Sequence, residues 1–229
     1  MQFHHKYNSR FLRDSRIEKI TLFQGRYFIC YNYHMLVKFR MKKKDWTGIF
    51  LTARVQRLYK EYEDNIISGL ETASGLSFRR GFTIVVSDIT GDHNTWFLGS
   101  GIDKKEAALI ELDASAVIGD DLILWILVNL IGCKLLGQNH VWPQTVKNKE
   151  ILNERWSRLV YSFSVDAIEI GFGSQHAKSI MEHIAKDSLG ISSDKAWKWA
   201  ISMTPKQRKA AWKKLKASYS HSLHRPANI

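Results

Sequence analysis

Four residues in the C-terminal half, Cys133, His140, Asp166 and His176, are of types that bind metal ions. Cys133 and His140 are seven residues apart, a spacing that places two side chains on one face of a helix. A metal site needs three or four converging ligands held by neighbouring hydrogen bonds. Nine histidines scattered through a basic chain produce such sets by chance. We therefore predict no metal site, with His140 and His176 at the surface or at helix ends.

Acidic residues near the ends of two apolar runs suggest a second chemistry. Asp88 ends one run, and Glu111 and Asp113 lie near the end of the next. Paired carboxylates at such positions hold Mg²⁺ in nucleases. However, the place two residues after Glu111, where restriction-type nucleases carry a lysine, holds Asp113. The glycine-rich segment 171–176 (GFGSQH) lacks the Lys-Ser/Thr pair of a nucleotide-binding loop. The sequence predicts neither a catalytic set nor a cofactor.

The positive charge of the chain is concentrated at its C-terminal end. The formal net charge is +12, and no acidic residue follows Asp194, whereas nine lysines and arginines do. A block of one sign typically faces a polyanion or an acidic protein partner, or else forms a solvated surface. The sequence leaves both readings open.

A basic helix is predicted to open at Thr204-Pro205, with Gln207 in the capping-box position. Its apolar strip consists of Ala211, Trp212, Leu215 and Tyr219, and cations recur at three- and four-residue steps on another side. The candidate binding surface comprises the basic residues of this region: Lys198, Lys206, Arg208, Lys209, Lys213, Lys214 and Lys216.

Tryptophans lie among these cations and allow two interpretations. Trp197 and Trp199 precede the helix, and Trp212 lies within it. Aromatic side chains between cations can stack nucleic-acid bases while the cations neutralise phosphates. Alternatively, an amphipathic helix packs its tryptophan inward and leaves its lysines in water. We expect the tryptophans to pack inward.

The elements that position these residues follow from hydrophobic patterning. Strands are predicted in 17–40, with a turn at Gln24-Gly25, and again at 82–89 and 107–112. A helix is predicted over 49–70, and five helices fill the chain after residue 120. Asp120 or Asp121 is predicted to cap the first of these five helices and Gly137 to end it, and Gly171 and Gly173 are predicted to end the second. The sequence therefore predicts an α+β fold: an N-terminal β-rich region over 1–48, then an α+β domain over 49–229 with a helical C-terminal half.

Further predictions rest on composition. The chain is 45% hydrophobic and carries two widely spaced cysteines, Cys30 and Cys133, which favours a folded protein of a reducing compartment, the cytoplasm. The N-terminal segment shows no secretory signal. The apolar run 122–136 is shorter than the roughly 20 residues that a bilayer requires, so we predict no membrane span.

Two helical segments and their flanks resemble a known family. The run ILVNLIGCKLLGQNH (126–140) resembles the HExxH helix of the HtpX-like and prenyl-protease-like zinc metallopeptidases, and the run 162–184, with Asp166-Ala167, resembles the family's ExxAD helix. HNTWFLGSG (93–101) resembles its upstream Asn-Ala-Trp/Phe strand, and SHSLHRP (220–226) its closing His-Pro…Arg segment. The resemblance covers about residues 80–226 and implies a zincin-like fold.

The resemblance also implies which residues stand at the zinc positions. HExxH places two histidines on one helix face with a glutamate that activates water. Asn129, Leu130 and Cys133 occupy those places, and Ser162 occupies that of the third ligand. Only Gly132 and Asp166 match the family. The resemblance therefore implies a pseudopeptidase without zinc or catalysis.

Three functions follow as expectations. The first is a non-catalytic, metallopeptidase-like interaction protein whose basic C-terminal surface binds an acidic partner. The second is a nucleic-acid-binding protein that uses the Lys/Arg/Trp-rich helices. The third is an enzyme of a class without a recognisable motif, for which a polar pocket lined by His93, Glu111 or Asp113 would be the evidence. The sequence leaves the oligomeric state open.

Overall fold

The computed structural model describes residues 17–23, 26–31, 37–41, 46–88, 98–99, 107–112, 119–141, 149–186 and 195–220. The expected strands and helices are present. The strands are β1 (Ile17–Phe23), β2 (Arg26–Tyr31), β3 (Val37–Met41), β4 (Phe82–Asp88), β5 (Leu98–Gly99) and β6 (Ala107–Leu112). The helices are α1 (Trp46–Ser74), α2 (Asp120–Gln138), α3 (Lys149–Phe172), α4 (Ser174–Lys186), α5 (Lys195–Ile201) and α6 (Pro205–Ser220).

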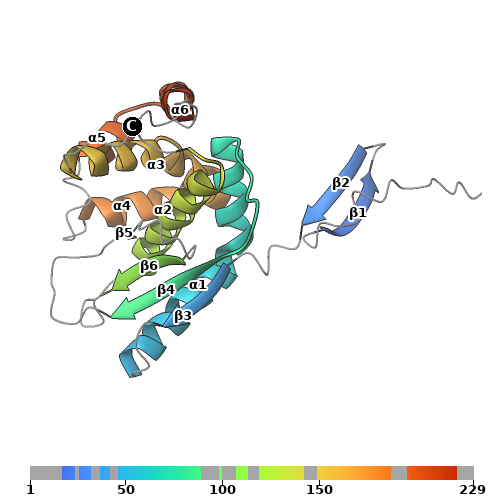
Figure 1. Ribbon diagram of the computed structural model, residues 1–229, viewed down its shortest axis with the longest axis vertical. Coiled ribbons are helices and arrows are strands. Elements are labelled where there is room, and N and C mark those ends of the chain that lie inside the picture. Colours follow the sequence, from blue (N-terminus) through green and yellow to red (C-terminus); the bar gives the residue numbers. More distant parts are fainter. Residues whose placement is uncertain are drawn as a thin grey trace, which may run out of the picture.

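The strands form two separate sheets. β1 and β2 make an antiparallel hairpin, and the larger sheet has the order β3-β4-β6-β5 (Figure 1). In this sheet β3, β4 and β6 are parallel and β5 is antiparallel to β6. β3, which the sequence analysis grouped with the N-terminal strands, therefore belongs to the larger sheet. The α+β class is confirmed.

One face of the larger sheet is buried beneath helices. Val37, Ile84, Val86 and Ile110 share this face in the strand register and are at most 9% exposed. α1 packs against β3 and β4, and α2 packs against β5 and β6. β4 presents Phe82, Ile84 and Val86 to this face, because alternate residues of a strand share a face, and Val85 on the opposite face is also buried.

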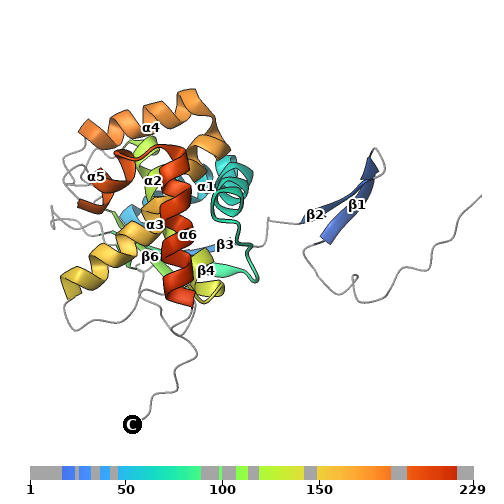
Figure 2. The same cartoon turned by 90° about the horizontal axis from the view of Figure 1, so that it is seen from above.

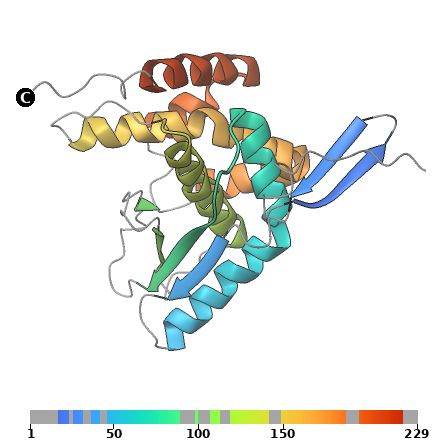
Figure 3. The same cartoon turned by 45° about the vertical axis from the view of Figure 1, so that its right-hand side comes forward.

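The helices build a second layer on this base. α3 packs against α1 and α2, and α5 and α6 pack against the opposite side of α3. Figure 2 shows α6 crossing over α3, and Figure 3 shows α6, drawn in red, at the end of the molecule away from the sheet. α2 is apolar all round because it lies between the sheet and α3, and its residues from Leu122 to Gly132 are all buried. No helix within the described ranges has the length and apolar character needed to cross a bilayer.

The ends of α2 and α3 differ from the sequence prediction. Asp120 or Asp121 was expected to cap α2, but Gly119 is its N-cap and makes no side-chain capping bond. Gly137 was expected to end the helix, but α2 continues to Gln138, and His140 adopts the left-handed conformation, with φ of 56°. Gly171 lies within α3, and Gly173, with φ of 78°, separates α3 from α4.

Candidate functional site

The helix α6 begins as its sequence predicts. Thr204 and Gln207 form the capping box: the Gln207 amide donates to Thr204 Oγ1 over 3.3 Å, and the Thr204 amide donates to Gln207 Oε1 over 2.8 Å. This exchange satisfies backbone donors that the first helical turn would otherwise leave unpaired. The capping box therefore defines where α6 begins.

The inner face of α6 is anchored to the core by its aromatic residues. Trp212 is 3% exposed and Tyr219 is 8% exposed. The Trp212 indole donates from Nε1 to the Ser74 carbonyl over 2.8 Å, and its ring lies 4.9 Å from that of Phe163. α6 is thus tied to both α1 and α3. The expectation that this tryptophan packs inward is confirmed.

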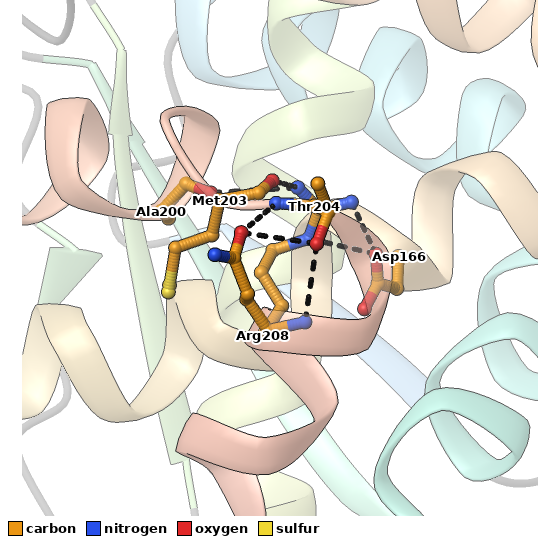
Figure 4. A network of polar contacts seen from close by, with 6 residues as sticks. Asp166, Ala200, Met203, Thr204 and Arg208 are labelled. Carbon is orange, nitrogen blue, oxygen red and sulfur yellow. Dashed lines mark hydrogen bonds and ion pairs between the residues drawn. The ribbon is translucent and has the colours of Figure 1, made fainter.

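Arg208 is buried and does not belong to the predicted basic surface. It is 6% exposed, and its Nε donates to Asp166 Oδ1 over 2.7 Å. Its Nη1 donates to the carbonyls of Met203 and Ala200. Figure 4 shows this network, in which one guanidinium joins α3, the end of α5 and α6. Arg208 must therefore be removed from the predicted set, because its charge is used inside the protein.

The outer face of α6 is a row of lysines, which we call the lysine face: Lys206, Lys209, Lys213 and Lys214. All four are exposed, and none is paired with a carboxylate in the described parts of the chain. Lys206 and Lys213 are seven residues apart, which is about 10 Å along a helix. Lys198 on α5 is also exposed, whereas the half-buried Lys216 places its ammonium 5.7 Å from the Trp212 ring centroid. The structure thus leaves four clustered charges facing solvent.

The tryptophans do not form a base-stacking platform. Trp197 is 2% exposed, and its ring makes an edge contact with that of Trp125 at 4.8 Å. Trp199 is half-buried, and the Arg158 guanidinium lies 5.5 Å from its ring centroid. Tryptophans and lysines that alternate in the sequence therefore face opposite sides in the structure: the tryptophans pack toward the core and the lysines face solvent.

Asn129 and Leu130, which the resemblance places at zinc positions, lie in the interior. Both are fully buried. Asn129 Nδ2 donates to the Trp125 carbonyl over 2.7 Å, and its Oδ1 accepts from Ser164 Oγ over 2.9 Å. The amide is thereby satisfied within the protein and has a structural function, which links α2 to α3.

Ser162 is not the residue that faces Asn129. Its hydroxyl donates to the Leu159 carbonyl of its own helix over 2.7 Å. Ser162 and Asp166 are four residues apart and share a face of α3, and Asp166 points to Arg208 of α6. Ser164, two residues from each, bonds Asn129 of α2 instead. Ser164 was not among the predicted site residues, and its two-residue offset from Ser162 places the two hydroxyls on different sides of α3.

Cys133 is a half-buried thiol of α2 that packs against the hydrophobic core. Burial raises its pKa from the ordinary value of 9.0 to about 12, and the nearby Lys134 only partly opposes this. A thiol must lose its proton to bind zinc or to act as a nucleophile. At neutral pH Cys133 is therefore a weak ligand.

This raised pKa yields a prediction for pH dependence. The folded protein holds the Cys133 proton more tightly than the unfolded chain does, so its contribution to stability is complete below pH 9. That contribution should be lost as the pH rises from about 9 to 12. In Cys133→Ala the midpoint of urea unfolding should fall less over this interval than in the unmutated chain. Native Cys133 should also resist alkylation at pH 8, and rapid alkylation there would contradict the assignment.

The other candidate ligands do not assemble into a site. His140 is exposed at the end of α2, as predicted. His176 is half-buried, and its Nε2 lies 3.5 Å from Asp121 Oδ1. Within the described ranges no three residues among His, Cys, Asp and Glu are arranged to hold a metal ion. Asp88 and Glu111 lie in β4 and β6, whereas Asp113 and His93 lie outside the described residues.

The N-terminus of α2 carries a polar cluster that the sequence analysis missed. Asp120 accepts from Arg54 Nε over 2.9 Å and from Arg57 Nη2 over 3.0 Å, both on α1. Asp121 accepts from Ser179 Oγ over 2.9 Å and lies 2.6 Å from His183 Nδ1, both on α4. The two carboxylates, expected to cap the helix, instead fasten α2 to α1 and α4.

Comparisons with known proteins were made at the level of family models, curated proteins and solved structures, and none of the three found a match.

Proposed function

We propose that this protein is a non-catalytic interaction protein, with a metallopeptidase-like core, that binds an acidic protein partner through the lysine face. The observation that carries the proposal is the set of four exposed lysines on α6 without a carboxylate partner in the described chain. Clustered charges of one sign attract an oppositely charged partner and accelerate its encounter. By contrast, the exposed Arg57 on α1 is paired with Asp120.

Two features support the metallopeptidase-like part of the proposal. The helix with Asn129 and the helix with Asp166 follow the sheet in the order that the resemblance requires, and they are joined by the bond from Ser164 to Asn129. The side chains at the zinc positions are an amide with satisfied hydrogen bonds, a leucine and a protonated thiol. Stoichiometric zinc in the purified protein, with peptide cleavage lost in Cys133→Ala, would contradict this part.

Nucleic acid is the alternative partner, and the same lysines would neutralise its phosphates. Three observations favour the acidic protein. Trp197 and Trp212 are buried and unavailable for stacking. The buried Arg208 leaves the exposed row on α6 with lysines only, which lack the planar fork that recognises bases and phosphates in bidentate fashion. Gln207, the amide at the start of α6, is occupied by the capping box.

The lysine face is tested by charge reversal. The double variant Lys209→Glu/Lys213→Glu should bind immobilised polyglutamate about tenfold more weakly, because exposed ion pairs contribute roughly 0.2–1 kcal/mol each and reversal adds repulsion. The readout is the dissociation constant at two salt concentrations, and the affinity should fall with added salt.

A matched control separates the surface from net charge. Lys38→Glu/Lys60→Glu changes the formal charge equally, by two units at each of two exposed lysines on β3 and α1, from +12 to +8. This control should keep the affinity of the unmutated chain. An equal loss of affinity in both double variants would mean that net charge, rather than the lysine face, determines binding. Duplex DNA that binds more tightly than polyglutamate, with an affinity that falls steeply with salt, would favour the nucleic-acid alternative.

A further inference from the structure

β3 lies at the edge of the larger sheet. It pairs with β4 on one side, and no strand of the described chain pairs with its other side. A free edge exposes backbone N–H and C=O groups that can bind another strand. Val37 and Phe39 point to the helix-covered face, where the Phe39 ring contacts that of Tyr59 at 5.3 Å, whereas Lys38 and Arg40 are exposed. The edge thus offers one apolar side and one charged side.

The hairpin of β1 and β2 is a two-stranded sheet without a third strand among the residues that the structure describes. Two strands alone are only marginally stable in water, so a hairpin requires a further strand or helix. Five residues, 32–36, separate the end of β2 at Tyr31 from the start of β3 at Val37. This is a usual length for the loop of an antiparallel pair. Strands consecutive in sequence are neighbours in most sheets.

The length of the connection between β2 and β3 defines a register. If β2 pairs antiparallel with β3 across the five intervening positions, Tyr31 lies opposite Val37, and Ile29 and Tyr27 lie opposite Phe39 and Met41. Alternate residues of a strand share a face, so Tyr27, Ile29 and Tyr31 would extend the helix-covered face of β3, while Phe28 and Cys30 would share the other face with Lys38 and Arg40. The observed register of the hairpin pairs Ile29 with Ile20 and Tyr27 with Leu22, which continues the apolar face into β1.

We propose that β2 pairs antiparallel with the free edge of β3, with Cys30 opposite Lys38, to give a six-stranded sheet of order β1-β2-β3-β4-β6-β5. The occupant of the edge is the protein's own hairpin. A second copy of β3 fits less well, because an antiparallel pair centred on Phe39 would set Lys38 opposite Arg40 of the second copy, and like charges directly opposite are unfavourable. The proposal is independent of the lysine face on α6.

The test uses the native cysteine of β2. In Lys38→Cys the new thiol would lie opposite Cys30, and partners in an antiparallel pair have Cα atoms about 4.5–5.5 Å apart, within the range of a disulfide. Mild oxidation of the full chain should remove two of its three thiols within one molecule. Cys133 is half-buried on α2, away from the strands of the test, and should remain free. The readout is a thiol count with peptide mapping.

Two variants calibrate the result. In Lys19→Cys the new residue is the observed partner of Cys30 within the hairpin and should form the disulfide readily. In Thr83→Cys the new residue is the neighbour of Lys38 on β4, one strand further away, and should leave both thiols free. Failure of Lys38→Cys to crosslink while Lys19→Cys does so would overturn the proposal. A disulfide between two molecules would overturn it too, because the edge would then accept a strand from another copy.

Discussion

Replacing Gly171 by alanine is expected to lower the free energy of unfolding by about 3 kcal/mol, at the upper end for overpacking, because two helix backbones touch at this residue. A Cβ at Gly171 would collide with the backbone carbonyl of Asn65 on α1, and one at Gly69 with the carbonyl of Ala167 on α3. Asn65 Nδ2 also donates to the Gly171 carbonyl over 2.5 Å. Since backbone atoms cannot turn aside as a side chain can, α1 and α3 would have to separate.

Gly132→Ala is the matched control. Gly132 is also a helical glycine at a helix contact, but its Cβ would meet side-chain atoms of Leu70 and Phe163 at 3.4 Å. Alanine gains about 1 kcal/mol of helix propensity, so this variant should stay within about 1 kcal/mol of the unmutated chain. Gly69→Ala/Gly171→Ala should cost less than the sum of its single variants, because the first separation makes room for the second. Urea unfolding measures the free energy of unfolding of the two single variants, the double variant and Gly132→Ala. If the losses of Gly69→Ala and Gly171→Ala add fully in the double variant, the two glycines do not share one contact.

Part of this architecture follows from sequence pattern alone. The apolar run that begins at Phe82 predicts a buried strand, and the apolar run 122–136, broken by Asn129 and Lys134, predicts a buried helix. The close approach of Gly171 to Asn65 was not predictable, because it joins residues 106 positions apart. Local periodicity indicates which face is buried but not how closely two backbones meet.

The predicted basic surface was also wrong at a residue whose partner is distant in the sequence. Lysines and arginines were counted together as charge, so Arg208 was grouped with the solvent-facing lysines. Its spacing nevertheless carried a signal, because Arg208 is four residues before Trp212 and so shares its inward face. The partner that makes burial of the guanidinium possible, Asp166, lies 42 residues earlier. No local pattern reports such a pair, and it became visible only when α3 and α6 were placed side by side.

The ion pair between Asp166 and Arg208 is the basis of the second prediction, a large loss of stability in Asp166→Ala. Removing one partner of a buried ion pair costs about 3–5 kcal/mol, because the remaining charge stays buried without compensation. The side chains of Asp166 and Arg208 are 16% and 7% exposed, so Asp166→Ala should fall in this range. The guanidinium would keep only its bonds to the Met203 and Ala200 carbonyls. Amide hydrogen exchange should accelerate first in α6, because the pair of Asp166 and Arg208 holds the N-terminal half of this helix against α3. Urea unfolding should give the total loss in the free energy of unfolding.

Two further variants separate charge burial from simple loss of contact. Glu154→Ala breaks another arginine–carboxylate pair on α3, with Arg158, in which the side chains are 38% and 41% exposed. Pairs of this exposed kind contribute about 0.3–0.5 kcal/mol, so little change is expected. Asp166→Met/Arg208→Met removes both buried charges and should recover most of the stability lost in Asp166→Ala, since apolar side chains of similar volume replace buried pairs at little cost. A double variant no more stable than Asp166→Ala would mean that packing, rather than the unpaired charge, sets the loss. The order of the three variants therefore assigns the energy that holds α6, and with it the lysine face, against α3.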